Sequence, residues 1–208
     1  MTWIKFCGCT SWADAEMAVA AGADAVGMIL AHSPRRVGMD VVREIVQRLP
    51  DRVEPVAVVV NPSHRDLDAM LAACPRMTVQ FSGSETPELV ARLGDRAFKA
   101  IHVDARSGTE RLEAACALYP QARALFDTYG DGLAGGTGRT FEWERVAEIA
   151  RTRDIVVAGG LNPGNVGACV RAARPFGVDV RSGIESDGRK DAQKMRAFFN
   201  AVRAADAA

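Results

Sequence analysis

The sequence lacks an excess of charge of either sign. Its 26 Lys and Arg residues balance its 26 Asp and Glu residues. Proteins that grip nucleic acid through its phosphates usually carry a basic excess, so we expect no nucleic-acid partner here. Any anionic ligand must therefore be bound by a few local groups.

The sequence also lacks a long hydrophobic run and a secretory leader. The first residues, MTWIKF, contain no basic segment followed by an apolar stretch and a small-residue cleavage site. No segment approaches the length needed to cross a bilayer. We therefore expect a cytoplasmic protein with no membrane partner.

Cysteines are few and odd in number, at Cys7, Cys9, Cys74, Cys116 and Cys169. This scatter argues against a disulfide framework and predicts mostly buried thiols. A Cys-x-Cys pair needs further ligands to hold a metal, and the three histidines show no ligand spacing. We therefore predict no metal site.

What the sequence does contain is a repeated alternation of apolar, strand-length runs with amphipathic, helix-length segments. The predicted strands are Trp3–Cys7, Ala25–Leu30, Glu54–Val60, Met77–Phe81, Ala97–Val103, Ala122–Phe126, Ile155–Ala158 and Val178–Val180. The predicted helices are Ser11–Ala21, Met39–Leu49, Ser63–Ala73, Pro87–Leu93, Thr109–Leu118, Phe141–Arg151, Asn165–Ala173 and Asp191–Ala204.

Eight such units in 208 residues predict an α/β fold, a (β/α)₈ TIM barrel in which residues 1–208 form a single domain. The structural alternative is an open doubly wound sheet. It is less favoured because no Gly-x-Gly-x-x-Gly motif follows the first predicted strand. In a barrel, functional groups lie at the carboxyl ends of the strands, so this rule selects the candidate site.

Two glycine-containing motifs follow the last two predicted strands. Gly159 and Gly160 close the seventh strand, and Ser182 and Gly183 close the eighth. Glycines there let backbone N–H groups approach an anion, and this fold commonly holds phosphate at these loops. Tight turns would also explain each pair alone, but their joint position favours a phosphate site.

Four further side chains lie at or shortly after predicted strand ends. Asp127 follows the sixth strand and is a candidate proton donor or acceptor, although Asp also commonly caps turns. The glycine-rich segment after it suggests a flexible cover. Cys7 ends the first strand; an inert core thiol is the alternative, and reactivity would require nearby positive charge. Arg35 and Arg36 follow the second strand. One of them is a candidate for binding a carboxylate; the alternative is that both are solvated at the surface.

In this order the motifs resemble those of the phosphoribosylanthranilate isomerase family across essentially the whole chain. KFCGCT is similar to the family's Lys-Ile-Cys-Gly-Ile-Thr, and AGADAVGMIL, SPRRV and VQFSGSE also match. LFD, GGTGRTFEW, AGGLNPGNV, VDVRSGIES and GRKD complete the resemblance. The resemblance implies a cofactor-free isomerase of tryptophan biosynthesis that forms a (β/α)₈ barrel.

The resemblance also implies roles for individual residues. Cys7 would be the general base, Asp127 the general acid, and Arg36 the group that holds the anthranilate carboxylate. Gly159, Gly160, Ser182 and Gly183 would hold the phosphate. This division of labour requires the pKa of Asp127 to rise and that of Cys7 to fall.

Two positions depart from the family pattern: Ser82 replaces a usual histidine, and Arg181 replaces a small residue. Gln80 lies on the same strand face as Ser82, and Asp179 on the same face as Arg181. We therefore predict that Gln80, Asp179 and Arg181 join Arg36 in contacting substrate. We also expect Arg181 to fill space near Ser82 and to pair with Asp179, Asp127 or the ligand.

Three alternative functions remain open from the sequence. A related barrel isomerase could act on another phosphorylated aminosugar, with the pocket around Arg36, Ser82 and Arg181 as the discriminator. A phosphate-ligand binding protein without catalysis is disfavoured because both Cys7 and Asp127 are present. A cysteine-based redox or metal protein is the remote option. For the oligomeric state, the resemblance allows a monomer or a homodimer.

Overall fold

Eight parallel strands close into a barrel in this computed structural model, which describes residues 1–104, 107–128 and 141–208. The strands are β1 (Trp3–Cys7), β2 (Ala25–Ile29), β3 (Glu54–Val59), β4 (Thr78–Phe81), β5 (Ala97–Val103), β6 (Arg123–Thr128), β7 (Ile155–Val157) and β8 (Gly177–Val180). They pair in sequence order, and β1 closes the ring by pairing with β8. The predicted barrel is confirmed.

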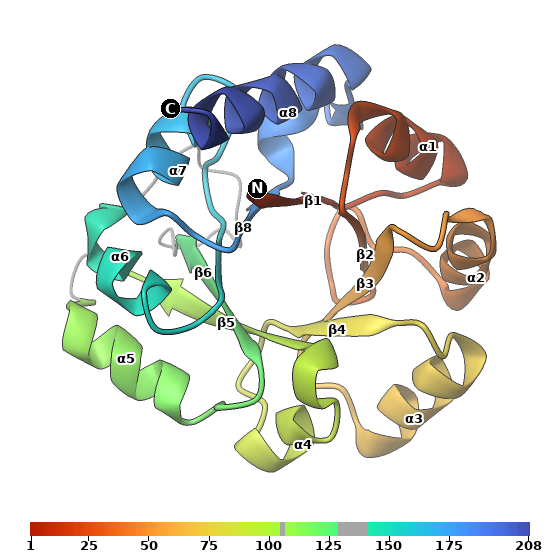
Figure 1. The fold of residues 1–208 in the computed structure, drawn as a ribbon. Coiled ribbons are helices and arrows are strands. Elements are labelled where there is room, and N and C mark those ends of the chain that lie inside the picture. The colour runs from red at the N-terminus through yellow and green to blue at the C-terminus, as the bar shows by residue number, and fades with distance from the viewer. Residues whose placement is uncertain (105–106, 129–140) are drawn as a thin grey trace.

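Helices surround this ring on the outside, as Figure 1 shows in a view along the barrel. They are α1 (Trp12–Ala21), α2 (Met39–Arg48), α3 (His64–Ala73), α4 (Pro87–Ala91), α5 (Thr109–Ala117), α6 (Glu144–Ala150), α7 (Val166–Ala173) and α8 (Ala192–Asp206), with short 3₁₀ turns η1 (Gly94–Arg96) and η2 (Ser182–Ile184). Three helices begin where hydroxyl caps predict. Ser11, Ser63 and Thr86 each accept a hydrogen bond from a backbone N–H of the first turn.

An aromatic cluster fills the barrel at the amino-terminal ends of the strands. The Trp3 ring stacks on Phe98 with centroids 5.5 Å apart and lies 5.9 Å from Phe176. The Arg123 guanidinium covers Phe98 and Phe176 at 5.4 and 5.2 Å. This end of the barrel is packed with side chains, so a ligand must enter from the other end.

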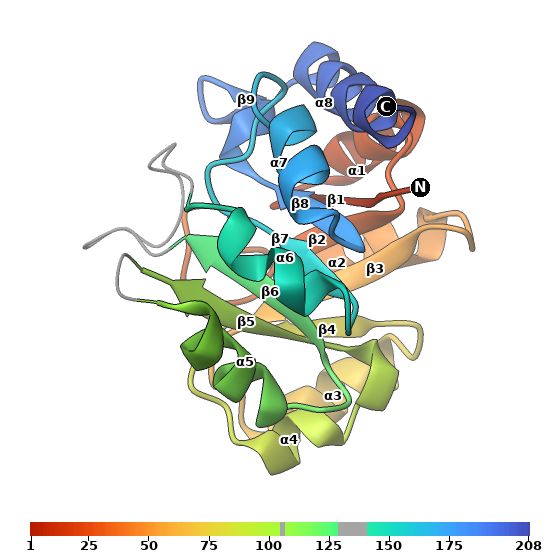
Figure 2. The ribbon, with the colours of Figure 1, turned by 60° about the vertical axis from the view of Figure 1, so that its left-hand side comes forward.

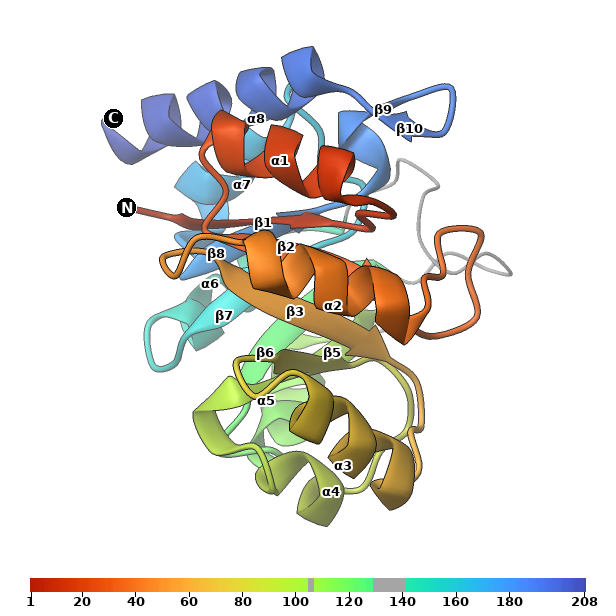
Figure 3. The ribbon, with the colours of Figure 1, turned by 90° about the vertical axis from the view of Figure 1, so that its right-hand side faces the viewer.

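The carboxyl ends of the strands carry a hairpin of two short strands, β9 (Glu185–Ser186) and β10 (Arg189–Lys190). Figures 2 and 3 show the hairpin at the opposite end of the molecule from the two termini. Within the described ranges, no helix is long and apolar enough to cross a membrane.

Candidate active site

A buried lysine occupies the centre of the barrel. The side chain of Lys5 on β1 is fully buried, and its Nζ donates hydrogen bonds to Gln80 Oε1 at 2.9 Å and to Asp179 Oδ1 at 3.1 Å. Burial works to lower the pKa of Lys5, but Asp179 and Cys7 outweigh burial and raise it. Lys5 therefore carries a positive charge inside the barrel, next to two residues that the sequence predicted as substrate contacts.

Cys7 lies two residues further along the same face of β1. It is 5% exposed, and the charge of the Lys5 ammonium acts on its thiol and favours the thiolate. Gly27 on β2 pairs in register with Cys7, and a Cβ on Gly27 would lie 2.8 Å from Cys7 Sγ and 3.0 Å from Lys5 Cε. The glycine thus provides the space in which the thiol and the ammonium meet.

The pKa of Cys7 does not shift in the direction that the resemblance requires. Burial raises it above the ordinary thiol value; the nearby cations Lys5 and Lys190 oppose that rise, and the Asp179 carboxylate reinforces it. The expected fall is therefore wrong for this structure, because desolvation of the thiolate outweighs the two cations. Cys9 is also fully buried, and burial raises its pKa to about 12, which suits a structural thiol.

Asp127 shifts in the direction expected of a proton donor. It is half-buried on β6 and pairs in register with His102 on β5. Burial raises its pKa, the Asp179 carboxylate adds to the rise, and His102, Arg181 and Lys5 oppose it. Asp179 and Lys5 act electrostatically on both Asp127 and Cys7, so the two candidate catalytic groups belong to one site.

The predicted phosphate loops after β7 and β8 lie against each other. Gly159 and Gly160 have φ angles of +83° and +66°, which favour glycine. A Cβ on Gly183 would overlap the Leu161 carbonyl oxygen, so the loop after β8 packs directly on the loop after β7. Ser182 begins η2 and is half-buried at the same rim.

The β9–β10 hairpin is tied to the end of β1 through Lys190. Its Nζ donates to the carbonyl oxygens of Cys7 at 2.6 Å and Arg181 at 3.1 Å, and to Glu185 Oε1 at 2.8 Å. Arg35 binds both carboxylate oxygens of Glu185. Burial works to raise the pKa of Glu185, but the hydrogen bonds from Arg35 and Lys190 outweigh burial and lower it.

Arg181 directly follows β8, and Asp127 is one of the partners that the sequence allows for it. The Cγ of Arg181 would be 3.2 Å from a Cβ on Gly8, so its stem runs over the loop after β1. Its charge acts on Asp127. Ser82 Oγ accepts a hydrogen bond from the Gln80 amide at 3.2 Å, and Asp179 pairs with Lys5.

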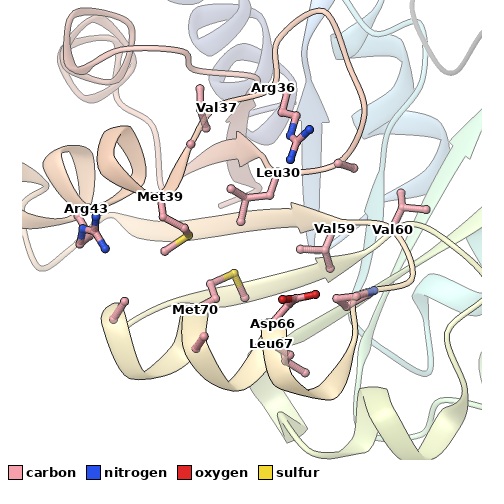
Figure 4. Close-up of a pocket in the computed structure, with 15 residues that line it drawn as sticks. Leu30, Arg36, Val37, Met39, Arg43, Val59, Val60, Asp66, Leu67 and Met70 are labelled. Atoms are coloured by element: carbon pink, nitrogen blue, oxygen red, sulfur yellow. The ribbon is translucent and has the colours of Figure 1, made fainter.

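Arg36 lies on the loop after β2, at the rim of a groove of about 490 Å³ between α2 and α3. Figure 4 shows its labelled lining residues, Leu30, Arg36, Val37, Met39, Arg43, Val59, Val60, Asp66, Leu67 and Met70. Arg36 is exposed, whereas Arg35 is held by Glu185. Of the two arginines, Arg36 is thus the one whose guanidinium is available to a ligand. The glycine-rich segment expected as a cover lies at 129–140, outside the described residues.

Sequence reasoning missed Lys5 and Lys190, two cations that act on the Cys7 thiol. A signal for Lys5 exists, because a lysine inside an otherwise apolar run that is buried on both faces needs an internal partner. Lys190 lies within the GRKD motif, and nothing local to that motif indicates that its ammonium reaches the end of β1.

Comparison with known proteins agrees with this architecture. Residues 4–201 match the family model described as N-(5'phosphoribosyl)anthranilate (PRA) isomerase. The N-(5'-phosphoribosyl)anthranilate isomerase of Desulforudis audaxviator is 42% identical over 205 residues, covering 99% of this chain and 100% of that protein. The Pseudomonas aeruginosa isomerase is 43% identical over 202 residues, covering 96% of this chain and 94% of that protein.

Solved structures are similar over nearly the whole chain. The phosphoribosyl anthranilate isomerase of Thermotoga maritima superposes with a TM-score of 0.87 at 33% identity, covering 98% of this chain and 100% of that one. A phosphoribosyl anthranilate isomerase in complex with reduced 1-(o-carboxyphenylamino)-1-deoxyribulose 5-phosphate gives a TM-score of 0.84 at 32% identity, with the same coverage. This chain belongs to the N-(5'-phosphoribosyl)anthranilate isomerase family.

Proposed function

We propose that this protein catalyses the Amadori rearrangement of N-(5-phosphoribosyl)anthranilate to 1-(2-carboxyphenylamino)-1-deoxyribulose 5-phosphate in tryptophan biosynthesis. The observation that supports the proposal is that Cys7 and Asp127 lie at the carboxyl ends of β1 and β6, on the same rim of the barrel. Lys5 and Asp179 act electrostatically on both groups. An aldose-to-ketose isomerisation requires such an acid and base.

Asp127 acts as the general acid. In its protonated form it donates to the ring oxygen of the furanose, and the ring opens to a protonated Schiff base. Burial raises the pKa of Asp127 and so favours the protonated carboxyl. The thiolate of Cys7 then removes the proton from C2′, and the resulting enol-amine tautomerises to the ketone.

The remaining predicted residues hold the substrate. Arg36 is proposed to bind the anthranilate carboxylate through a bidentate guanidinium contact. Backbone N–H groups around Gly159, Gly160, Ser182 and Gly183 are proposed to bind the phosphate. Arg181 is proposed to contact the substrate near Asp127, and Gln80 and Asp179 to shape the pocket floor through Lys5.

We propose that residues 1–208 act as one catalytic domain, because the first strand pairs with the last strand of the barrel. The phosphorylated substrate of a biosynthetic pathway supports a cytoplasmic location. A homodimer or a monomer is compatible with the family, since a Thermotoga maritima relative is described as dimeric, with monomers generated from it.

The test is the decay of anthranilate fluorescence when the protein is added to phosphoribosylanthranilate generated in situ, with the ketone identified by carbon NMR. We expect decay with formation of the ketose. Absence of decay, with binding of the substrate retained, would instead support the non-catalytic phosphate-ligand barrel. Absence of decay together with turnover of another phosphorylated aminosugar would support the related isomerase.

A further inference from the structure

We propose that Lys5 is a positioning residue for the isomerase: its buried ammonium supplies the positive charge on which the Cys7 thiolate depends, and Asp179 competes with the thiolate for that charge. The inference rests on the proposed function only in taking Cys7 as the base.

The geometry places the ammonium directly beneath the thiol. Lys5 and Cys7 are two residues apart on one face of β1, and both side chains pack on the bare Cα of Gly27. The Lys5 side chain is fully buried, so water does not screen its charge. Its hydrogen bonds to Asp179 at 3.1 Å and Gln80 at 2.9 Å fix the ammonium in place.

The charged groups that act on Cys7 come from three strands. Lys5 reaches it from β1, Asp179 from β8 and Lys190 from β10. Lys190 is already neutralised by Glu185 at 2.8 Å, and that carboxylate is itself bound by Arg35. Among the described residues, Lys5 pairs with one carboxylate, that of Asp179, at 3.1 Å. A thiolate on Cys7 would therefore be the second anion on the Lys5 ammonium.

Two substitutions should consequently shift the ionisation of the Cys7 thiol in opposite directions. Removing the cation by Lys5→Met leaves the thiolate buried without compensation. Removing the competing anion by Asp179→Asn leaves the Lys5 charge to the thiolate alone. A merely structural ion pair would not produce this contrast, because breaking it from either side disturbs the same packing.

The experiment measures the rate of iodoacetamide alkylation of Cys7 against pH, with the site identified by tandem mass spectrometry and by its absence in Cys7→Ala. Only the thiolate reacts, so the midpoint of the profile reports its ionisation. We expect the midpoint of Asp179→Asn to lie about 1 to 3 pH units below that of the unmodified protein. We expect that of Lys5→Met to lie above it by a similar amount.

Lys5→Met leaves Asp179 buried and unpaired and can lose its fold, which circular dichroism would reveal. The double variant Lys5→Met with Asp179→Asn removes both charges and serves as the second test, with a midpoint expected above that of Asp179→Asn by at least one pH unit. Arg171→Met, which removes an exposed charge on α7, is the control and should leave the midpoint unchanged. A midpoint in Asp179→Asn that is unchanged or raised overturns the proposal.

Alkylation requires no substrate, so this outcome is separate from that of the isomerase assay. Opposite midpoint shifts without isomerase activity would support the charge arrangement and contradict the proposed function. Isomerase activity without the midpoint shifts would support the proposed function and contradict the charge arrangement.

Discussion

At the scale of single residues, the site depends on polar groups placed inside an otherwise apolar barrel. Lys5 is fully buried, yet its ammonium is matched by a carboxylate and an amide oxygen. A buried charge without such partners would be strongly destabilising. These partners therefore hold the Lys5 ammonium in place near Cys7, although burial alone would disfavour its charge.

Gly27→Ala tests how closely the thiol and the ammonium must fit. The new Cβ would lie 2.8 Å from Cys7 Sγ and 3.0 Å from Lys5 Cε, so one of them must move. We expect kcat to fall about 10- to 100-fold from misplacement of the base. We expect the free energy of unfolding to fall by about 1–3 kcal/mol from overpacking.

Fluorescence decay gives the first value and urea unfolding gives the second. Gly108→Ala is the matched control, since its Cβ would meet nothing within 4 Å. A Gly27→Ala protein as active as the Gly108→Ala control would mean that the position of Cys7 is less constrained than the contacts indicate.

At the scale of elements, the β9–β10 hairpin holds the ends of two barrel strands. Lys190 bonds the carbonyl of Cys7 at the end of β1 and that of Arg181 just after β8. Glu185 on β9 connects this lysine to Arg35 in the loop after β2. The hairpin therefore joins three consecutive parts of the rim around the thiol.

Lys190→Met removes the hydrogen bonds to the Cys7 and Arg181 carbonyls, while the ion pair between Glu185 and Arg35 remains. Two carbonyls lose a charged donor, and we expect a loss of about 1–3 kcal/mol in the free energy of unfolding. We also expect kcat to fall more than KM rises, because the backbone that carries the base is loosened. Arg189→Met on the same hairpin is exposed and should match the unmodified protein; equal effects of the two substitutions would exclude a specific role for Lys190.

Elements with a local signal were predictable from the sequence, and others were not. Apolar runs placed all eight strands, and Ser11, Ser63 and Thr86 marked true helix starts. β6 extends past the predicted end at Phe126 to Thr128, because these residues pair with β5. The hairpin was missed because strands of two polar residues each have no hydrophobic period.

The same limit applies to the site. Cys7, Asp127 and the glycine loops follow from strand ends, which the sequence marks by position. Lys5 depends instead on Gln80 and Asp179, which lie 75 and 174 residues away along the chain. The rise in the pKa of Cys7 depends on burial that only the closed barrel produces.

At the scale of the whole molecule, the two ends of the barrel contain different kinds of side chain. Aromatic rings fill the amino-terminal end, and the polar groups lie towards the carboxyl end. The outer shell contains buried ion pairs of its own, such as Lys99 with Glu85 at 2.7 Å between β5 and the loop before α4. Such pairs make the stability of the barrel depend on pH.

Stability should fall in acid. Burial works to raise the pKa of Glu85 and of Glu185, but hydrogen bonds, chiefly from Lys99 and from Arg35 respectively, lower both. A carboxyl whose folded-state pKa is depressed stabilises the fold above its unfolded-state pKa of about 4.3. That contribution is lost as pH falls through the lower folded-state value.

We therefore expect the urea midpoint of unfolding to decrease as the pH is lowered from about 5. Glu85→Gln should make this decrease shallower, whereas Glu113→Gln, on the exposed side of α5, should not. A midpoint that does not change between pH 6 and pH 3 would contradict the assigned role of these carboxylates.

The measurement that tests the acid–base assignment most directly is the isomerisation rate of Cys7→Ala and Asp127→Ala beside Cys116→Ala, a buried thiol outside the barrel interior. With folding verified for each variant, we predict that the Cys7 and Asp127 substitutions each reduce kcat by about 10²- to 10⁴-fold. Cys116→Ala should retain the activity of the unmodified protein. Near-normal turnover in either the Cys7 or the Asp127 variant would contradict the assignment of these two residues as base and acid.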